Sequence, residues 1–582
     1  MVCSVSLVES AREQVMSKRL LSTSPPSPGP KTPVGFRPAK GGFGSPGPLR
    51  RVIVISLALP FAGCALVGPD FKKPTAPVAA SYTDVDGKPI SQLGGDASAS
   101  KTEEIRDWWT VFHDPTLDRL IDTAYHQNLT LVSAGTRVLE ARAELGIAVG
   151  EWYPQQQQVG GSVNYNRFSK QDAFAFANPP GNFWRASLGT ALAWELDFWG
   201  KFRRGIESAD ASYLASIASY DDVLVTLLGD VATTYIGIRT VQKQIDLAQQ
   251  NIARQRRALS IANDRFRNGA TTRLDVYQAQ AVLGATEARV PQLANQLQEG
   301  INVLHVLLGM PPSAINDMLA QSAGIPVAPG KIDLGIPADL LRRRPDIRTA
   351  EFRAAAQSAQ IGVAKADLYP SFSLVGNIGL VSSNVGKASL GDIFTHGAVA
   401  YSFGPSFQWN ILNYGQITNN VRVQDARLQA LLVDYKNTVL KAQQEVENGI
   451  AAFVLSRQAA DALRGTVTAA DGALNLAFTQ YQEGLSDFTT VLTAEQNLLE
   501  SENALAVTMG QTATSLAMLY RALGGGWEIR AGKDFVPAAT KDEMKNRTNW
   551  GGILQTPSEG QAVPPPEPSG PKKGPFVDAP IW

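Results

Sequence analysis

Residues 399–411 read VAYSFGPSFQWNI, a stretch in which large apolar or aromatic side chains alternate with small or polar ones. Such alternation is typical of a β-strand, because successive side chains point to opposite faces of a sheet. Residues 371–381 alternate in the same way, and a loop rich in Gly, Ser and Asn joins the two stretches. The pattern therefore predicts a hairpin with one apolar, aromatic face and one small, polar face.

A similar hairpin pattern occupies residues 155–169 and 183–198, because the two halves of the chain repeat at an offset of about 215 residues. The landmarks that share this offset are Trp194 and Trp409, Gly200 and Gly415, Tyr220 and Tyr435, Gly269 and Gly484, and Leu308-Gly309 and Leu523-Gly524. Tyr153-Pro154 and Tyr369-Pro370 match one residue out of this register. We interpret the repeat as a duplicated structural unit, which suggests assembly around a pseudo-symmetry axis.

After each hairpin, apolar residues recur every three or four positions, a spacing that is typical of helices that pack along one another. This spacing predicts a pair of long helices in each repeat, at residues 201–268 and 271–309 and again at residues 416–482 and 486–523. The first would be on the order of 100 Å long at 1.5 Å per residue. Asn268-Gly269 and Glu483-Gly484 are predicted to be the turns between the paired helices.

Aromatic residues opposite small polar ones suit the wall of a transmembrane barrel, which has lipid on one side and water on the other. Four strands are too few to close a pore, so a barrel would need several copies of the chain. Two alternatives stay open at this point. The strands could form a soluble sandwich with its apolar faces turned inward, and the helices could form a free coiled-coil stalk.

The N-terminal region carries a candidate export signal. Arg50-Arg51 precede the apolar run 52–63, which is about a dozen residues long and so shorter than the roughly 20 that span a bilayer as a helix. Phe61-Ala62-Gly63-Cys64 resembles a bacterial lipobox, although Phe61 stands where Leu is usual. Acylation of Cys64 is expected, and Ala65 in place of Asp points to the outer membrane. An ordinary signal peptide is the alternative.

Composition narrows the function further. The 53 basic and 53 acidic residues balance, which argues against a nucleic-acid partner. The cysteines are Cys3 and Cys64, so the mature chain would hold one thiol and no internal disulfide. The four histidines lack metal-ligand spacing, and no phosphate loop, nucleophile elbow or zinc motif occurs. We expect no enzyme activity, no metal and no cofactor.

Two groups of residues form longer motifs. The first comprises Trp108-Trp109, Phe112, Asp114-Pro115, Leu117, Leu120 and Asn128-Leu129. The second comprises Arg344-Pro345-Asp346-Ile347-Arg348, Ala350-Glu351, Ile361-Gly362 and Tyr369-Pro370. These motifs resemble the opening segment and the internal signature of a known family, the TolC-like outer membrane efflux proteins in their NodT-type lipoprotein subgroup.

The resemblance implies an α+β membrane protein that forms a homotrimer. Four strands from each of three chains would complete a trimeric 12-stranded β-barrel, and the long helices would form a periplasmic α-barrel. The expected protein is an exit duct in the cell outer membrane, lipid-anchored through Cys64 and extending into the periplasm. It would passively export small amphipathic compounds or drugs that an inner-membrane RND pump delivers through a periplasmic adaptor. A type I secretion duct and a lipid-anchored structural stalk remain alternatives.

The expected organisation has six parts. Residues 1–63 are a leader and lipoprotein signal peptide with a low-complexity stretch at 1–49, and 64–100 are a lipid-anchored N-terminal segment. Residues 101–312 are the first repeat, 313–338 a connector and 339–526 the second repeat. Residues 527–582 are a C-terminal tail, with a low-complexity stretch at 564–575 that we expect to be disordered.

The resemblance also implies where the duct would close. The tip turns at Asn268, Gly269, Glu483 and Gly484 would contact the adaptor. The candidate gate residues are Asp275, Tyr481, Thr489 and Thr493, with a hydrogen bond from Tyr481 to Asp275 as a latch. Relatives often carry a leucine and an aspartate where Thr489 and Thr493 stand, and some carry an arginine at Ser486. A ring of threonines would select less for cations than a ring of carboxylates.

Overall fold

The computed structural model describes residues 66–83, 87–90, 92–93, 103–167, 181–312, 319, 324–329, 332–333 and 343–554. All of them belong to one compact unit that spans Cys64–Trp582. The predicted leader, Cys64 itself and the low-complexity stretch 564–575 lie outside the described residues.

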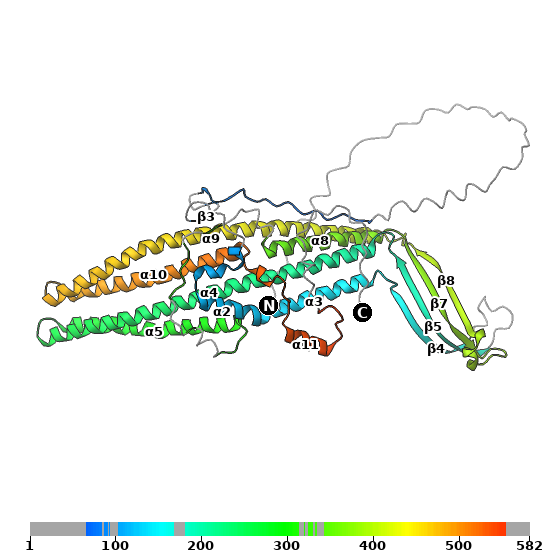
Figure 1. Ribbon diagram of the computed structural model, residues 1–582, viewed down its shortest axis with the longest axis horizontal. Helices are drawn as coiled ribbons and strands as arrows, with labels where there is room; N and C mark the ends of the chain where they lie inside the picture. The colour runs from blue at the N-terminus through cyan, green and yellow to red at the C-terminus, as the bar shows by residue number, and fades with distance from the viewer. Residues whose placement is uncertain are drawn as a thin grey trace, which may run out of the picture. The chain divides into compact units, whose positions relative to one another are not determined.

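The two predicted hairpins join into one antiparallel sheet of four strands (Figure 1). Its strands are β4 (Gln156–Arg167), β5 (Asn182–Leu196), β7 (Ser371–Ser383) and β8 (Val399–Gln408), in the order β4-β5-β7-β8. The pairing of β5 with β7 connects the two repeats, with Trp194 opposite Leu374. Strands β4 and β8 are the outer strands of this sheet, and each has one edge without a partner strand.

The strand register places the predicted apolar side chains on one face of the sheet. Tyr165 lies opposite Trp184, Ile378 opposite Tyr401 and Phe372 opposite Phe407. Large apolar side chains on this face are widely exposed, among them Val159, Val163, Tyr165, Trp184, Leu188, Ile378, Tyr401, Phe403 and Phe407, with Phe403 at 80%. A soluble sandwich would bury such a face, so the structure contradicts that alternative.

The opposite face of the sheet is lined mostly by Gly, Ala, Ser, Asn and Gln. On this face, Gly189 of β5 lies opposite Gly379 of β7. A Cβ added at Gly189 would lie 2.8 Å from the Gly379 Cα and 2.8 Å from the Ile378 carbonyl oxygen. Glycine at both positions therefore permits a backbone approach that no other residue would fit without a shift.

Four long helices follow the hairpins, as the spacing predicts. They are α4 (Lys201–Arg267), α5 (Arg273–Leu307), α9 (Gln416–Glu483) and α10 (Phe488–Ala522). Gly200 and Gly415 precede α4 and α9 with φ of 78° and 82°, a left-handed conformation that glycine adopts without strain. The most apolar window of α4 has a mean hydropathy of 1.2 and is 61% buried, as expected of a core helix.

Shorter helices precede each hairpin and complete the core. Helices α2 (Pro115–Gln127) and α3 (Leu129–Gly150) lead into β4, and α8 (Pro345–Ala366) leads into β7. Helix α4 contacts α2, α3, α5, α8 and α10, while α9 contacts α8 and α10 (Figure 1). A large apolar cluster fills this region and includes Trp108, Leu228, Tyr235, Tyr435 and Leu516.

The two motifs that carry the family resemblance hold this core together. Asp114 caps α2 by accepting from the Thr116 amide, and its other oxygen accepts from the Tyr235 hydroxyl at 2.6 Å. Arg344 donates to Asp346, to Glu445 and to the Ala522 carbonyl. The motifs therefore join the start of each repeat to its long helices.

Residues 527–554, which the sequence analysis grouped with the tail, are packed against the core. They contain η4 (Trp527–Arg530) and α11 (Ala538–Arg547). Arg530 forms an ion pair with the fully buried Asp221 of α4, and Val536 and Met544 pack against Leu139 of α3. The strand alternation could not reveal this segment, because its contacts come from residues far away in the sequence.

The close glycine pair predicts a position-specific effect of added side chains. Gly189→Ala should lower the stability of the sheet by about 1–3 kcal/mol, because backbone atoms of Ile378 and Gly379 in β7 block the new Cβ. Gly160→Ala is the matched control, since Gly160 lies opposite Gly189 and a Cβ there meets nothing within 4 Å. Thermal unfolding followed by the β-sheet circular dichroism signal would measure both, and equal losses would contradict the steric account.

Candidate functional site

The two predicted tip turns lie at the same end of the helices (Figure 1). Asn268, Gly269, Glu483 and Gly484 are all exposed. Gly269 and Gly484 have φ of 72° and 79°, and each turn closes with a backbone bond of 2.8 Å, from Ala270 to Arg265 and from Leu485 to Gln480. The turns are therefore compact, and their polar backbone is accessible to a partner.

The structure brings Asp275 and Tyr481 together, as predicted. The Tyr481 hydroxyl donates to Asp275 Oδ2 at 3.1 Å, and the Thr271 hydroxyl donates to the same oxygen. Tyr481 ends α9 of the second repeat, and Asp275 begins α5 of the first. The predicted hydrogen bond is thus confirmed, and it joins the two helical hairpins immediately beside their turns.

Arg265 is a third member of this contact, and the sequence analysis missed it. Its guanidinium carbon lies 4.6 Å from the centre of the Tyr481 ring. Its Nη1 donates to the Tyr481 carbonyl and, at 3.2 Å, to the Gln482 carbonyl. An arginine suits the last carbonyls of a helix, where the helix dipole is negative. The basic last turn of α4 is visible in the sequence, but its partner helix is not.

The Tyr481–Asp275 contact, the predicted latch, lies on a small apolar cluster, and this environment sets the protonation of Tyr481. Tyr481 is 2% exposed, and its ring lies 5.1 Å from that of Phe488. Burial raises the pKa of Tyr481, and its hydrogen bond to Asp275 raises the pKa further. The hydroxyl therefore stays protonated and remains a donor at physiological pH. We name as the tip cluster the buried residues Ala258, Ala262, Val276, Ala279, Leu474, Ala477, Tyr481, Phe488, Val491, Leu492 and Leu498.

Thr489 and Thr493 lie apart from the latch, on the exposed side of α10. Thr493 donates to the Thr489 carbonyl at 2.9 Å, and both line a groove of about 960 Å³ between α9 and α10. Ser486 is half-buried in the turn, and its hydroxyl has no hydrogen-bond partner within the described residues. The structure therefore separates the four candidate gate residues into a hydrogen-bonded pair, the half-buried Asp275 with the buried Tyr481, and an exposed pair.

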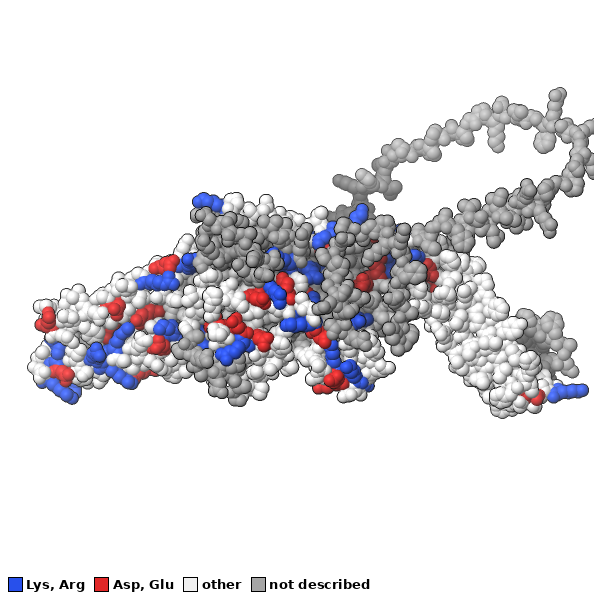
Figure 2. Space-filling model, in the orientation of Figure 1, with Lys and Arg blue, Asp and Glu red and all other residues white. Residues whose placement is uncertain are grey.

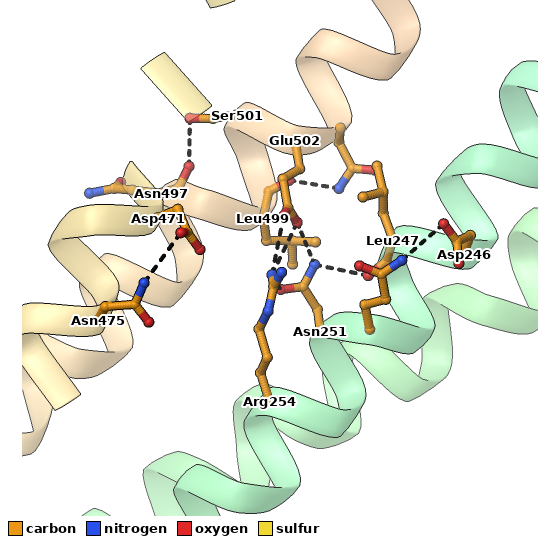
Figure 3. Close-up of polar contacts among 12 residues, drawn as sticks. Asp246, Leu247, Asn251, Arg254, Asp471, Asn475, Asn497, Leu499, Ser501 and Glu502 are labelled. Carbon is orange, nitrogen blue, oxygen red and sulfur yellow. Dashed lines mark hydrogen bonds and ion pairs between the residues drawn. The ribbon is translucent and has the colours of Figure 1, made fainter. Parts of the chain in front are cut away.

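A second polar contact joins the hairpins farther from the tips (Figure 3). Glu502 of α10 accepts from Asn251 Nδ2 at 2.9 Å and from Arg254 Nη1 at 3.2 Å, both on α4. Asn251 also donates to the Leu247 carbonyl of its own helix. This Arg254–Glu502 contact was also missed, because its residues lie about 250 positions apart and form no local pattern.

The segment just after Cys64 has a fixed position although Cys64 itself lies outside the described residues. The Val67 amide donates to the Trp199 carbonyl at 3.1 Å, and Arg204 donates to the Val67 carbonyl at 3.2 Å. A Cβ at Gly200 would lie 2.6 Å from a methyl of Leu66. Leu66 and Val67 therefore lie at the junction of β5 and α4.

No metal centre is evident in the part of the chain that the structure describes. There, no three His, Cys, Asp or Glu side chains lie close enough together to hold a metal ion. The site consists of two helical hairpins that meet through the Tyr481–Asp275 and Arg254–Glu502 contacts and through the apolar tip cluster, to which both hairpins contribute.

Comparison with known proteins agrees with this geometry. The sequence profile described as "Outer membrane efflux protein" matches residues 120–310 and 336–525. Nodulation protein T of Rhizobium leguminosarum bv. viciae is 31% identical over 485 residues, which cover 82% of this chain and 94% of that protein. The solvent efflux pump outer membrane protein SrpC of Pseudomonas putida is 30% identical, with coverage of 81% and 97%.

Solved structures show the same likeness. The outer-membrane channel OprN is 31% identical, with a TM-score of 0.72 over 79% of this chain and 99% of that one. The open state of the Neisseria gonorrhoeae MtrE outer membrane channel is 26% identical, with a TM-score of 0.65 and coverage of 80% and 99%.

Removal of the Tyr481–Asp275 hydrogen bond is expected to loosen the tips. Tyr481→Phe removes the donor to a carboxylate, a hydrogen bond of about 1.5–3 kcal/mol, so exchange of the tip amides should accelerate by roughly 10–100-fold. Ion leak through the reconstituted protein should rise in parallel. Tyr277→Phe is the control, because the Tyr277 side chain is 58% exposed on α5. Unchanged exchange and leak in Tyr481→Phe would remove the latch role.

Proposed function

Since the chain belongs to the outer membrane efflux protein family and is an efflux duct of the cell outer membrane, we propose that it is the exit duct of a tripartite export system. In this system an inner-membrane RND pump delivers small amphipathic compounds through a periplasmic adaptor. The duct itself is passive and takes its energy from the pump. Relatives whose names refer to solvent, toluene and antibiotic efflux support this class of compound.

The sheet is the observation that carries the proposal. Its apolar face is exposed, while its other face is small and polar. Backbone groups on the free edges of β4 and β8 would be costly in lipid unless another strand pairs with them. Closure by further copies satisfies both requirements, with β8 of one chain beside β4 of the next. Three copies of four strands make the 12-stranded barrel of the homotrimer.

The distribution of charge supports the same orientation. Figure 2 shows charged side chains over the helices, whereas the visible surface of the sheet is almost free of them. A charged side chain facing lipid is destabilising near the bilayer midplane. The charge-free surface therefore suits the membrane, and the charged helices suit the aqueous periplasm.

The position of Leu66 supports the proposed lipid anchor. Leu66 packs on Gly200 where β5 gives way to α4, and Cys64 is two residues earlier. Two residues span at most about 7 Å, so the acyl chains of Cys64 would start beside the periplasmic rim of the barrel. From there they can enter the adjacent leaflet without displacing a strand.

A lipid-anchored stalk is the less favoured alternative, because a stalk has no use for a sheet whose apolar face is exposed. A type I secretion duct shares the architecture and differs in its inner-membrane partner. Deletion of the chain should therefore sensitise cells to organic solvents and antibiotics, whereas loss of a secreted polypeptide without sensitisation would indicate the secretion duct.

If three copies close the barrel, the protein should be a trimer that conducts ions. The mature chain purified from outer membranes in mild detergent should have the mass of a trimer and a low single-channel conductance in planar bilayers. Tyr481→Phe should raise that conductance, because the proposed duct is held closed at the tips by the Tyr481–Asp275 hydrogen bond. The proposed duct would be contradicted by a monomer, or by an oligomer in which neither the wild type nor Tyr481→Phe conducts.

The lipid anchor has its own test. Wild-type protein from cells fed radiolabelled palmitate should carry label at its N-terminal residue, and Cys64→Ala should carry none. The conductance of the Cys64→Ala trimer should equal that of the wild type, because the anchor lies outside the barrel wall. Label that persists in Cys64→Ala would place acylation elsewhere.

A further inference from the structure

Glu495 is a buried acid that neither the latch nor the Arg254–Glu502 contact uses. It lies on α10 between Val491 and Leu498, both members of the tip cluster, and is 3% exposed. Neither carboxylate oxygen has a hydrogen-bond partner among the described residues. A buried ionised carboxylate without partners is strongly disfavoured, so this packing tolerates the protonated form far better.

The neighbouring helices offer Glu495 little compensation. On α4 the charged group that acts on it is Arg254, whose guanidinium is bound to Glu502 (Figure 3). Gln255 of α4 is also buried, and its Oε1 has no partner in the described chain. Among the tip residues of α9 and α5, Tyr481 and Asp275 are bound to each other, and Glu483, Arg273 and Tyr277 are exposed.

The position of Glu495 along α10 makes its charge relevant to opening. Glu495 is seven residues from the start of α10 at Phe488 and seven from Glu502, or about 10 Å along the helix in each direction. It therefore lies between the latch and the Arg254–Glu502 contact, in the interface of α4 and α10. That interface must separate if the two hairpins move apart at their tips.

We propose that Glu495 is a proton-operated switch, which holds the two helical hairpins together when protonated and favours their separation when ionised. The switch rests on the proposed function as a gated duct. In the separated arrangement, water reaches the carboxylate and compensates its charge. In the packed arrangement, residues of the same chain bury Glu495.

The direction of the pH effect follows from the two protonation equilibria. Burial raises the pKa of Glu495 from 4.5 to about 7, and Arg254 offsets only part of this rise. A solvated Glu495 in the separated arrangement keeps an ordinary pKa. As pH rises from about 4.5 to about 7, the separated form releases its proton first, so the packed form loses relative stability. Acid therefore closes the tips, and neutral pH loosens them.

The test measures the leak conductance of the intact mature trimer in planar bilayers between pH 5 and pH 8. Each pKa unit of difference corresponds to a tenfold change in equilibrium, so wild-type leak should rise by up to about 100-fold across this range. Glu495→Gln and Glu495→Leu should abolish the dependence. Glu500→Gln should keep it, because Glu500 is an exposed acid on the same helix.

Two results would overturn the switch. One is a wild-type leak that does not change with pH, and the other is a Glu495→Leu trimer that follows the wild-type curve. Two substitutions are used in case one variant fails to assemble. Both remove the titratable carboxyl group, Gln by a neutral polar side chain and Leu by an apolar one. If Tyr481→Phe opens the trimer and pH does not, the switch fails and the duct stands. If no variant conducts at any pH, the duct itself fails.

Discussion

The constraint on which the rest of the structure depends is the unsatisfied sheet. One chain supplies four strands with two free edges and an apolar face that no described residue of the chain covers. Water tolerates the edges but not so large an apolar face, whereas lipid tolerates the face but not the edges. The proposed closure with other copies meets both conditions.

Stability is distributed unevenly along the long helices. Beside α2, α3 and α8 they share a large apolar cluster that is reinforced by Asp114, Arg344 and the Arg530–Asp221 ion pair. Toward the turns the helices retain only the smaller tip cluster and a few polar contacts. Regions with fewer buried apolar contacts open at lower free energy. Motion is therefore expected at the tips, with the rest of the helices as a rigid frame.

The candidate site was partly predictable. Asp275 and Tyr481 could be paired because the family resemblance aligns two positions 206 residues apart, and the structure bears out their hydrogen bond. No comparable indication of a partner was present in the sequence for Arg265, Glu495 or Glu502. Each looks in the sequence like an ordinary charged residue of a helix, since charge patterns do not tell which helix will face it. Thr489 and Thr493 were grouped with the latch because the family resemblance places them where relatives often carry a leucine and an aspartate, and the rotation of α10 puts them on its exposed side.

The sequence by itself determined the elements and their order. The alternation at 399–411, the threes and fours after Gly200 and Gly415, and the glycines at the turns predicted strands, long helices and tips, because these signals act between residues close in the chain. Tertiary structure decided which helices touch, and with them the burial of Glu495, the use of Arg254 by Glu502 and the packing of residues 527–554. These features depend on contacts between residues hundreds of positions apart. The rotation and crossing of the helices determine which residues meet there, and local periodicity does not.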